Sequence, residues 1–213
     1  MSNEHSLPEN VILANKKTMI EMLRSTKREG IDNLISFMNG PESDFFTAPA
    51  SSRYHLCTRG GLNQHSLNVQ YVGDILNKTF GLFTTESLNI TTNLHDIEKG
   101  TKKYVEKYLK NGSRGATPYE KTEDLPLGHG EKSVMLIQKY IDLTPQEAMC
   151  IRWHMGPYDY AFRQYEEAIK RTYPEVFMIY FADHLATLFL DNGKLPAKDT
   201  KEMITAIAET VEI

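Results

Sequence analysis

The feature that most constrains this fold is the recurrence of apolar residues at helical spacing, in blocks that glycine and proline interrupt. One block runs from about Asn15 to Arg28, and a second, from Ile31 to Met38, ends at Asn39-Gly40-Pro41. Apolar residues three and four positions apart share one face of a helix, so each block predicts an amphipathic helix.

The same spacing continues along most of the chain. Residues 41–60 lack it, and we expect an ordered loop there. Thr144 is placed to cap a helix that has Pro145 at its first position. The further predicted helices span Gly61 to Asn77, about Thr85 to Asp96, Gly130 to Tyr140, Pro145 to Trp153, Ala161 to Arg171, Pro174 to Leu190 and Thr200 to Val211.

The stretch around residues 100–124 is the least regular part of the chain. Residues 102–109 fit either a short helix or a strand, and the Asn111-Gly112 pair that follows is typical of a tight β-hairpin. The predicted fold class is therefore all-α, a helical bundle with a small β-hairpin insertion around residues 100–124.

A chain of 213 residues is long enough for one domain with its own core. We expect a loose N-terminal tail over residues 1–14 and a single domain over residues 15–195. Residues 196–213 are expected to form a C-terminal helix that packs on the same domain.

Charge and cysteine content narrow the class of protein. A formal net charge of -4 gives no reason to expect a protein that coats nucleic acid. Cys57 and Cys150 form neither a zinc-finger spacing nor a disulfide framework, which favours a reducing compartment. The N-terminus has no apolar signal core, and no apolar run approaches the ~20 residues of a membrane span. We therefore expect a cytoplasmic protein whose partners include neither a membrane nor a long nucleic acid.

Histidines and aspartates recur at intervals of 25 to 34 residues, each in or beside a predicted helix. Neutral imidazole and carboxylate are ligands that suit a divalent metal such as iron, manganese or zinc. Each interval fits one helix with its connection, and a helical bundle can bring such positions to one level. The series consists of His65, the doublet His95-Asp96, His129, His154 and Asp183.

Spacing alone leaves two interpretations of this series open. A lone histidine near an apolar face is usually a core or surface residue; this interpretation is assigned to His5, and the roles of His55 and His184 are left open. Adjacent helical residues point about 100° apart, so His95 and Asp96 can share one ion only if it lies at the end of their helix or between the two directions. A metal site and ordinary packing are equally favoured on this evidence.

Three segments carry a resemblance to a known family. They are Tyr54-His55-Leu56-Cys57-Thr58-Arg59-Gly60-Gly61-Leu62-Asn63-Gln64-His65-Ser66-Leu67-Asn68-Val69, Leu94-His95-Asp96-Ile97-Glu98-Lys99, and Leu125-Pro126-Leu127-Gly128-His129-Gly130-Glu131-Lys132-Ser133-Val134. With His154 and Asp183, this order resembles the HD-domain superfamily of metal-dependent phosphohydrolases over roughly residues 15–190. The likeness is to single-domain bacterial and phage HD hydrolases and to the HD module of a bacterial 3′-to-5′ exoribonuclease.

The resemblance implies roles for these residues. His65, His95, Asp96 and Asp183 would hold a first metal. Asp96 would bridge to a second metal that His129 and His154 also hold. Lys99 would face the substrate phosphate, so Asp96 and Lys99 are the expected catalytic residues. The chain departs from the family at Glu98, where glycine or cysteine is common, and at Asn63 and Gln64.

Groups around the presumed ligands have open assignments. Lys132, Arg59 and Arg152 are the expected substrate-binding cations, although each also fits a solvated surface charge. Thr91, Asn93 and His184 are candidate acceptors for the second nitrogens of the ligand histidines. Gly128 and Gly130 flank His129, where they suit either a close ligand or an ordinary turn. The aromatic residues Trp153, Tyr158, Tyr160, Phe162, Tyr165, Phe45, Phe46 and Tyr54 fit base stacking or, preferably, core packing.

The resemblance predicts a metal-dependent phosphohydrolase that uses metal-activated hydroxide on a nucleotide or another small phosphate ester. The expected cofactors are two divalent ions, drawn from Fe, Mn, Mg, Co or Ni, with zinc by occupancy. The alternatives are a phosphodiesterase on cyclic or short oligonucleotides and a non-catalytic nucleotide-binding or metal-sensor module. A di-iron oxygenase is a more remote alternative. Oligomeric state is left open.

Overall fold

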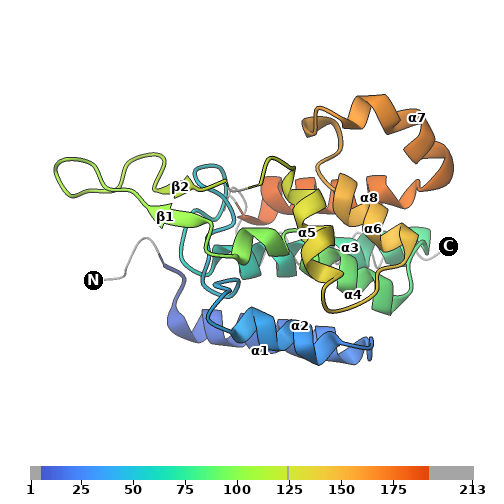
Figure 1. The fold of residues 1–213 in the computed structure, drawn as a ribbon, viewed down its shortest axis with the longest axis horizontal. Helices are drawn as coiled ribbons and strands as arrows, with labels where there is room; N and C mark the ends of the chain where they lie inside the picture. The colour runs from blue at the N-terminus through green and yellow to red at the C-terminus, as the bar shows by residue number, and fades with distance from the viewer. Residues whose placement is uncertain (1–5, 124, 192–213) are drawn as a thin grey trace.

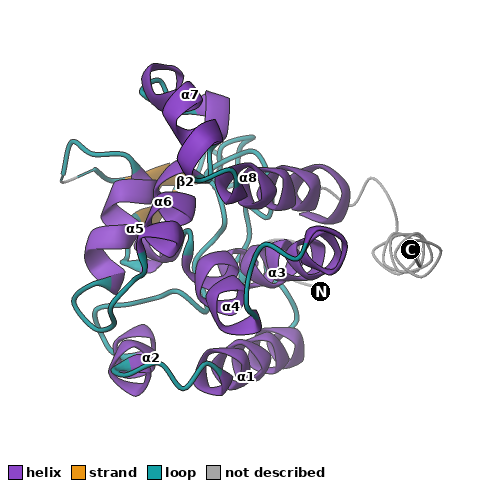
Figure 2. Ribbon diagram, turned by 90° about the vertical axis from the view of Figure 1, so that its right-hand side faces the viewer, coloured by secondary structure: helices purple, strands orange, loops and turns teal. Residues whose placement is uncertain are grey.

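Helix α3 (Gly61–Phe80) lies at the centre of the fold in the computed structural model, which describes residues 6–123 and 125–191. It packs against α1 (Glu9–Ser25), α4 (Thr85–Leu94) and α8 (Glu175–Leu185), as the end-on view in Figure 2 shows. Buried positions along α3 include polar side chains as well as apolar ones, and His65 is among them. The central helix therefore places polar side chains, including a histidine, in the interior of the protein.

The remaining helical elements surround this centre (Figure 1). They are α2 (Ile31–Asn39), α5 (His129–Ile137), α6 (Pro145–Trp153), α7 (Phe162–Thr172), the 3₁₀ helices η1 (Ile97–Gly100) and η2 (Gly156–Tyr158), and the π-helix η3 (Ala186–Asp191). The predicted all-α class with a small β-hairpin is confirmed.

Helix α6 shows why local sequence predicted these elements well. Thr144 accepts a hydrogen bond from the backbone N–H of Glu147, and the Glu147 side chain accepts one from the N–H of Thr144. This capping box satisfies two donors at a helix start, and Pro145 follows as the first helical residue. The predicted cap at Thr144 is confirmed.

The ends of the chain differ from the prediction or lie outside it. Helix α1 begins at Glu9, within the residues 1–14 expected to form a tail, because Ile12 is buried and draws this stretch into the core. The helix predicted from Pro174 to Leu190 is α-helical from Glu175 to Leu185 and continues as the π-helix η3. The C-terminal helix predicted within 196–213 lies outside the described residues.

The β-hairpin projects from the helical body (Figure 1). Strands β1 (Tyr104–Glu106) and β2 (Tyr119–Lys121) pair antiparallel, with Tyr104 opposite Lys121. The predicted hairpin is present, but Asn111-Gly112 does not join its two strands directly. Gly112 does make a local turn, with its N–H bonded to the Leu109 carbonyl at 2.8 Å, but that turn lies within the long loop 107–118.

Apolar packing divides into a large cluster and two smaller ones. The large cluster joins α1, α2, α4 and α5 through fully buried side chains such as Leu23, Leu34 and Leu94. A second cluster joins α6, α7 and α8 around Phe162 and Ile179. Core packing is thus the observed role of Phe162, and of Phe45 and Phe46 in the large cluster.

None of the helices within residues 6–123 and 125–191 combines the length and apolar composition needed to cross a bilayer.

Candidate metal centre

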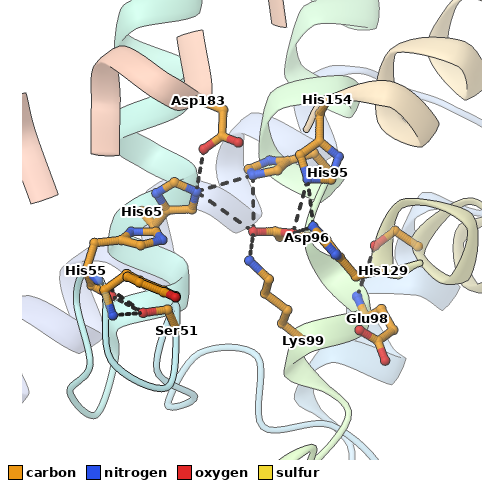
Figure 3. Close-up of polar contacts among 12 residues, drawn as sticks. Ser51, His55, His65, His95, Asp96, Glu98, Lys99, His129, His154 and Asp183 are labelled. Atoms are coloured by element: carbon orange, nitrogen blue, oxygen red, sulfur yellow. Dashed lines mark hydrogen bonds and ion pairs between the residues drawn. The ribbon is translucent and has the colours of Figure 1, made fainter. Parts of the chain in front are cut away.

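The six side chains of the predicted ligand series meet at one place in the interior (Figure 3). His65 projects from the N-terminal part of α3, and Asp183 from α8. His95 is the C-terminal cap of α4, His154 is the C-terminal cap of α6, and His129 is the first residue of α5. Asp96 follows the cap of α4, so the doublet lies at a helix end, which is one of the two placements expected for a shared ion.

His95 and His154 are oriented by the same local device. The last carbonyls of a helix have no partner within the helix. His95 donates from Nδ1 to the carbonyl of Thr92 at 2.8 Å, and His154 donates from Nδ1 to the carbonyl of Ile151 at 2.7 Å. A carbonyl can only accept, so each neutral ring presents the lone pair of Nε2 to the interior.

His65 is oriented differently, by a residue that sequence reasoning missed. Its Nδ1 lies 2.6 Å from Oδ2 of Asp191, which also accepts from Nδ1 of His55 at 2.8 Å. The groups that accept from Nδ1 of His95, His154 and His65 are therefore two backbone carbonyls and the Asp191 carboxylate. Of the candidates named from sequence, Thr91 donates to the Ser87 carbonyl and Asn93 donates to Gln70 of α3, so these bonds do not go to the ligand histidines.

Asp96 is placed between two groups of ligands. Its Oδ2 lies 3.4 Å from Nε2 of His95 and 3.9 Å from Nε2 of His65. Its Oδ1 lies 3.5 Å from Nε2 of both His129 and His154. Asp183 Oδ1 adds a further oxygen 3.2 Å from Nε2 of His65. The carboxylate of Asp96 thus faces one pair of histidines with each oxygen.

The residues fit a metal ion because their free atoms face one another. Nε2 of His65 and Nε2 of His95 lie 3.3 Å apart, and in neutral rings both present lone pairs. Nε2 of His129 and Nε2 of His154 lie 3.1 Å apart. Nitrogens that share an ion at about 2.1 Å lie roughly 3.0 to 3.4 Å apart for bond angles near 90° to 109°. Within the described residues, the buried Oδ1 of Asp96 has no hydrogen-bond partner.

The surroundings of Asp96 and His129 favour the protonation states in which these two residues bind a metal. Burial alone would raise the pKa of Asp96, but the ammonium of Lys99 and the neighbouring histidines outweigh it and hold that pKa well below its usual range. Burial and the Lys99 charge hold the pKa of His129 well below its usual range, so this ring is neutral near pH 7. Ionised carboxylate and neutral imidazole are the states that bind a metal.

A cavity of about 490 Å³ opens beside these ligands. His65, Asp96, His129 and Asp183 form part of its wall. Aromatic rings form another part: Tyr54 and Tyr158 are 68% and 63% exposed. The predicted core packing is therefore wrong for Tyr54 and Tyr158, because both residues are exposed at the cavity.

The predicted substrate-binding cations divide sharply. Lys99 lines the cavity, with Nζ 2.6 Å from Oδ2 of Asp96. Arg59, Arg152 and Lys132 do not line it, because acidic partners hold each of them elsewhere. These partners are Glu9 for Arg59, Glu131 and Asp159 for Arg152, and Glu98 and Glu123 for Lys132.

Glu98 also turns away from the ligands. It is buried, and its carboxylate lies 3.2 Å from Nζ of Lys132 and 3.6 Å from Nζ of Lys121. Lys121 belongs to β2, so Glu98 ties the hairpin to the helical body. Glu98 is not among the residues that line the cavity.

Comparison with protein-family models, with curated proteins and with solved structures found no match to this chain. The class that the fold and site define is thus an all-α protein with a buried histidine–aspartate cluster that can hold a metal ion.

Proposed function

We propose that this chain is a metal-dependent phosphohydrolase, related to the HD-domain superfamily, that acts on a nucleotide or another small phosphate ester. The observation that carries the proposal is the position of Asp96, whose two oxygens each face a separate pair of histidine Nε2 atoms. A bridging carboxylate with histidines on both sides suits two ions about one cavity.

Under this proposal His65, His95, Asp96 and Asp183 hold one ion, and Asp96, His129 and His154 hold the other. When bound, such a pair supplies hydroxide near neutral pH and stabilises charge on a phosphoryl oxygen. Asp96 stays ionised because the Lys99 charge keeps its pKa low despite burial. The helix-end carbonyls of Thr92 and Ile151 keep His95 and His154 in the tautomer that binds through Nε2.

Lys99 is the residue we assign to the phosphate. Among the described residues in the cavity wall, it alone is a lysine or arginine. Burial would lower the pKa of Lys99, but the Asp96 carboxylate outweighs burial and raises that pKa above its ordinary value. The ammonium therefore stays charged at neutral pH. An ammonium at the cavity wall can pair with a phosphate oxygen while the ions hold the others.

The aromatic wall supports a substrate with a planar group. Tyr54, Tyr158 and Tyr180 line the cavity together with His184, whose ring stacks on Tyr180 at 5.7 Å between centroids. Aromatic rings bind planar bases by stacking, with little dependence on base identity. A cavity of about 490 Å³ falls in the range of small-ligand sites. We therefore favour a nucleoside phosphate over an aliphatic ester.

The test compares Asp96→Asn with the wild-type chain and with Asp142→Asn, a matched change at an exposed acid away from the cavity. Elemental analysis after purification without added metal gives the ion content, and a phosphate-release screen gives activity. We expect wild type and Asp142→Asn to bind metal and turn over, and Asp96→Asn to lose both with its circular dichroism retained. Full activity in Asp96→Asn, or in metal-stripped wild type, would contradict the proposal.

The same screen separates the alternatives. Release of product from cyclic or dinucleotide substrates, but not from mononucleotides, would indicate a phosphodiesterase. Tight nucleotide binding by calorimetry without turnover of any substrate would indicate a binding or sensor module.

A further inference from the structure

Asp191 is buried beside the candidate metal centre and is bonded to three donors. Its side chain is fully buried. Oδ2 accepts from His65 and His55, and Oδ1 accepts from the Asn68 amide at 2.7 Å. Such a concentration of donors on one carboxylate, next to a presumed ligand, calls for a role beyond packing.

The position of Asp191 follows from a change in helix type. Helix α8 carries Asp183, and the chain then continues through the π-helix η3, which ends at Asp191. π-helical turns are rare and are found mostly at functional sites. Here the one continuous segment places Asp183 3.2 Å from Nε2 of His65 and Asp191 2.6 Å from Nδ1 of the same ring.

We propose that Asp191 is the positioning residue of the first metal site: its carboxylate fixes His65 with Nδ1 protonated and Nε2 directed at the ion. This proposal rests on the metal centre of the proposed function. A ring turned over about its Cβ–Cγ bond would lose Asp191 and remove Nε2 from Asp183 and Asp96. Carboxylates behind histidine ligands fix the ring and increase its basicity.

A carboxylate suits this place better than an amide. Three N–H groups converge on Asp191, and both of its oxygens accept. An asparagine has one acceptor oxygen and adds two donors, so at least one of the converging N–H groups would lose its partner.

The second site has no carboxylate of this kind at His154, whose Nδ1 donates to a backbone carbonyl. The effect of Asp191 is therefore expected on one ion only. Asp191→Asn is compared in two backgrounds: His154→Ala, which retains the first site, and His65→Ala, which retains the second. Asp74→Asn, an exposed change on α3, is the matched control.

Titration with Mn²⁺ measures the result, with circular dichroism as the check on folding. We expect Asp191→Asn to weaken Mn²⁺ binding by about 10- to 100-fold in the His154→Ala background and to leave it unchanged in the His65→Ala background. Asp74→Asn should change neither. The proposal would be overturned if Asp191→Asn left Mn²⁺ affinity unchanged in the His154→Ala background, or if it weakened Mn²⁺ binding equally in both backgrounds. Three ions per chain would also overturn it, since Asp191 would then be a ligand.

A second measurement needs no variant. Nitrogen NMR of the Zn²⁺-loaded wild-type chain reports which nitrogen of His65 carries a proton, and we expect Nδ1–H. A Zn²⁺ bond through Nδ1 would overturn the proposal. Two bound ions without turnover would remove the phosphohydrolase function and leave the positioning role standing, whereas no ion binding at all would remove both.

Discussion

Lys99 and Asp96 form an ion pair in which the lysine has a role that can be separated from metal binding. Nζ of Lys99 lies 2.6 Å from the same Asp96 oxygen that faces His65 and His95. A metal ion and an ammonium both neutralise this carboxylate, and like charges repel. Lys99 therefore opposes metal binding while it favours an anionic substrate.

Replacing Lys99 tests that separation. We expect Lys99→Met to lower kcat/KM for a phosphate ester by about 10- to 100-fold, the effect of a lost hydrogen bond between charged groups. Mn²⁺ affinity should stay the same or increase, because a cation beside Asp96 is removed. Steady-state kinetics and a Mn²⁺ titration measure the two effects.

Lys132→Met is the control for that change. Lys132 pairs with Glu98 and Glu123 outside the cavity wall, so its loss should lower the melting temperature and leave kcat/KM within about threefold. A larger loss of activity in Lys132→Met than in Lys99→Met would restore Lys132 as the phosphate-binding residue.

Single residues also show where prediction from sequence succeeded and failed. His65, His95, His129 and His154 were found because their order along the chain is informative. Asp191 was missed because the residue it holds, His65, is 126 positions away and no local pattern joins them. Lys132 was assigned to substrate by its place near His129, but a buried Glu98 attracts its charge, and sequence does not show which acid lies opposite a lysine.

Among the elements, the presence of most helices follows from local sequence, whereas the contacts between helices do not. Apolar spacing and the Thr144 cap predicted α6, because those signals are contained within one segment. The long loop between β1 and β2 was not predicted, because its length depends on which residues of the two strands pair, and local sequence does not show that. The role of Gly130 likewise depends on a partner helix: a Cβ there would collide with the backbone carbonyl oxygen of Arg152 on α6.

Gly130→Ala measures how closely α5 and α6 must approach. In a free helix this change stabilises by about 1 kcal/mol. Here we expect net destabilisation of about 1–3 kcal/mol, because the two backbones must separate. Separation would also move His129 from His154, whose Nε2 atoms lie 3.1 Å apart, and weaken binding of the second ion. Urea unfolding and Mn²⁺ titration measure the two effects.

Gly128→Ala is the matched control on the other side of His129. A Cβ at Gly128 would meet the carboxylate end of the Glu131 side chain, which can move aside. The backbone of Gly128 already has φ of -63°, which alanine adopts readily. Equal stability and ion binding in Gly130→Ala and Gly128→Ala would show that close helix contact is not what positions His129.

On the scale of the whole molecule, Arg28 joins segments that surround the site from a distance. It follows α1 and donates to Glu147 at the start of α6, from Nη2 at 2.7 Å, and to Glu86 of α4, from Nε at 2.6 Å. A third bond, 2.6 Å long, goes to the Asp142 carbonyl. Because α4 and α6 end at His95 and His154, this ion pair fixes two elements that deliver ligands.

Arg28→Met should therefore destabilise the fold substantially. The side chain of Glu147 is fully buried, and removal of Arg28 leaves its charge without the partner that offsets desolvation. We expect a loss of about 3 kcal/mol at pH 7 in urea unfolding of metal-free protein. Arg24→Met is the control, since Arg24 pairs with Asp32 in solvent and its loss should cost less than about 1 kcal/mol.

The dependence of this loss on pH identifies its cause. Burial would raise the pKa of Glu147, but the Arg28 bonds outweigh it and lower that pKa below its ordinary value of 4.5. A lowered pKa contributes stability that is present above the unfolded pKa and is lost as pH falls through the folded pKa. In Arg28→Met we expect the pKa of Glu147 to be raised instead, because burial without a charged partner favours the protonated carboxyl group.

The difference in the free energy of unfolding between wild type and Arg28→Met should therefore shrink from pH 7 to pH 4, while the difference for Arg24→Met stays small. A constant difference across this range would assign the loss to the packing of the Arg28 side chain and not to its ion pair with Glu147.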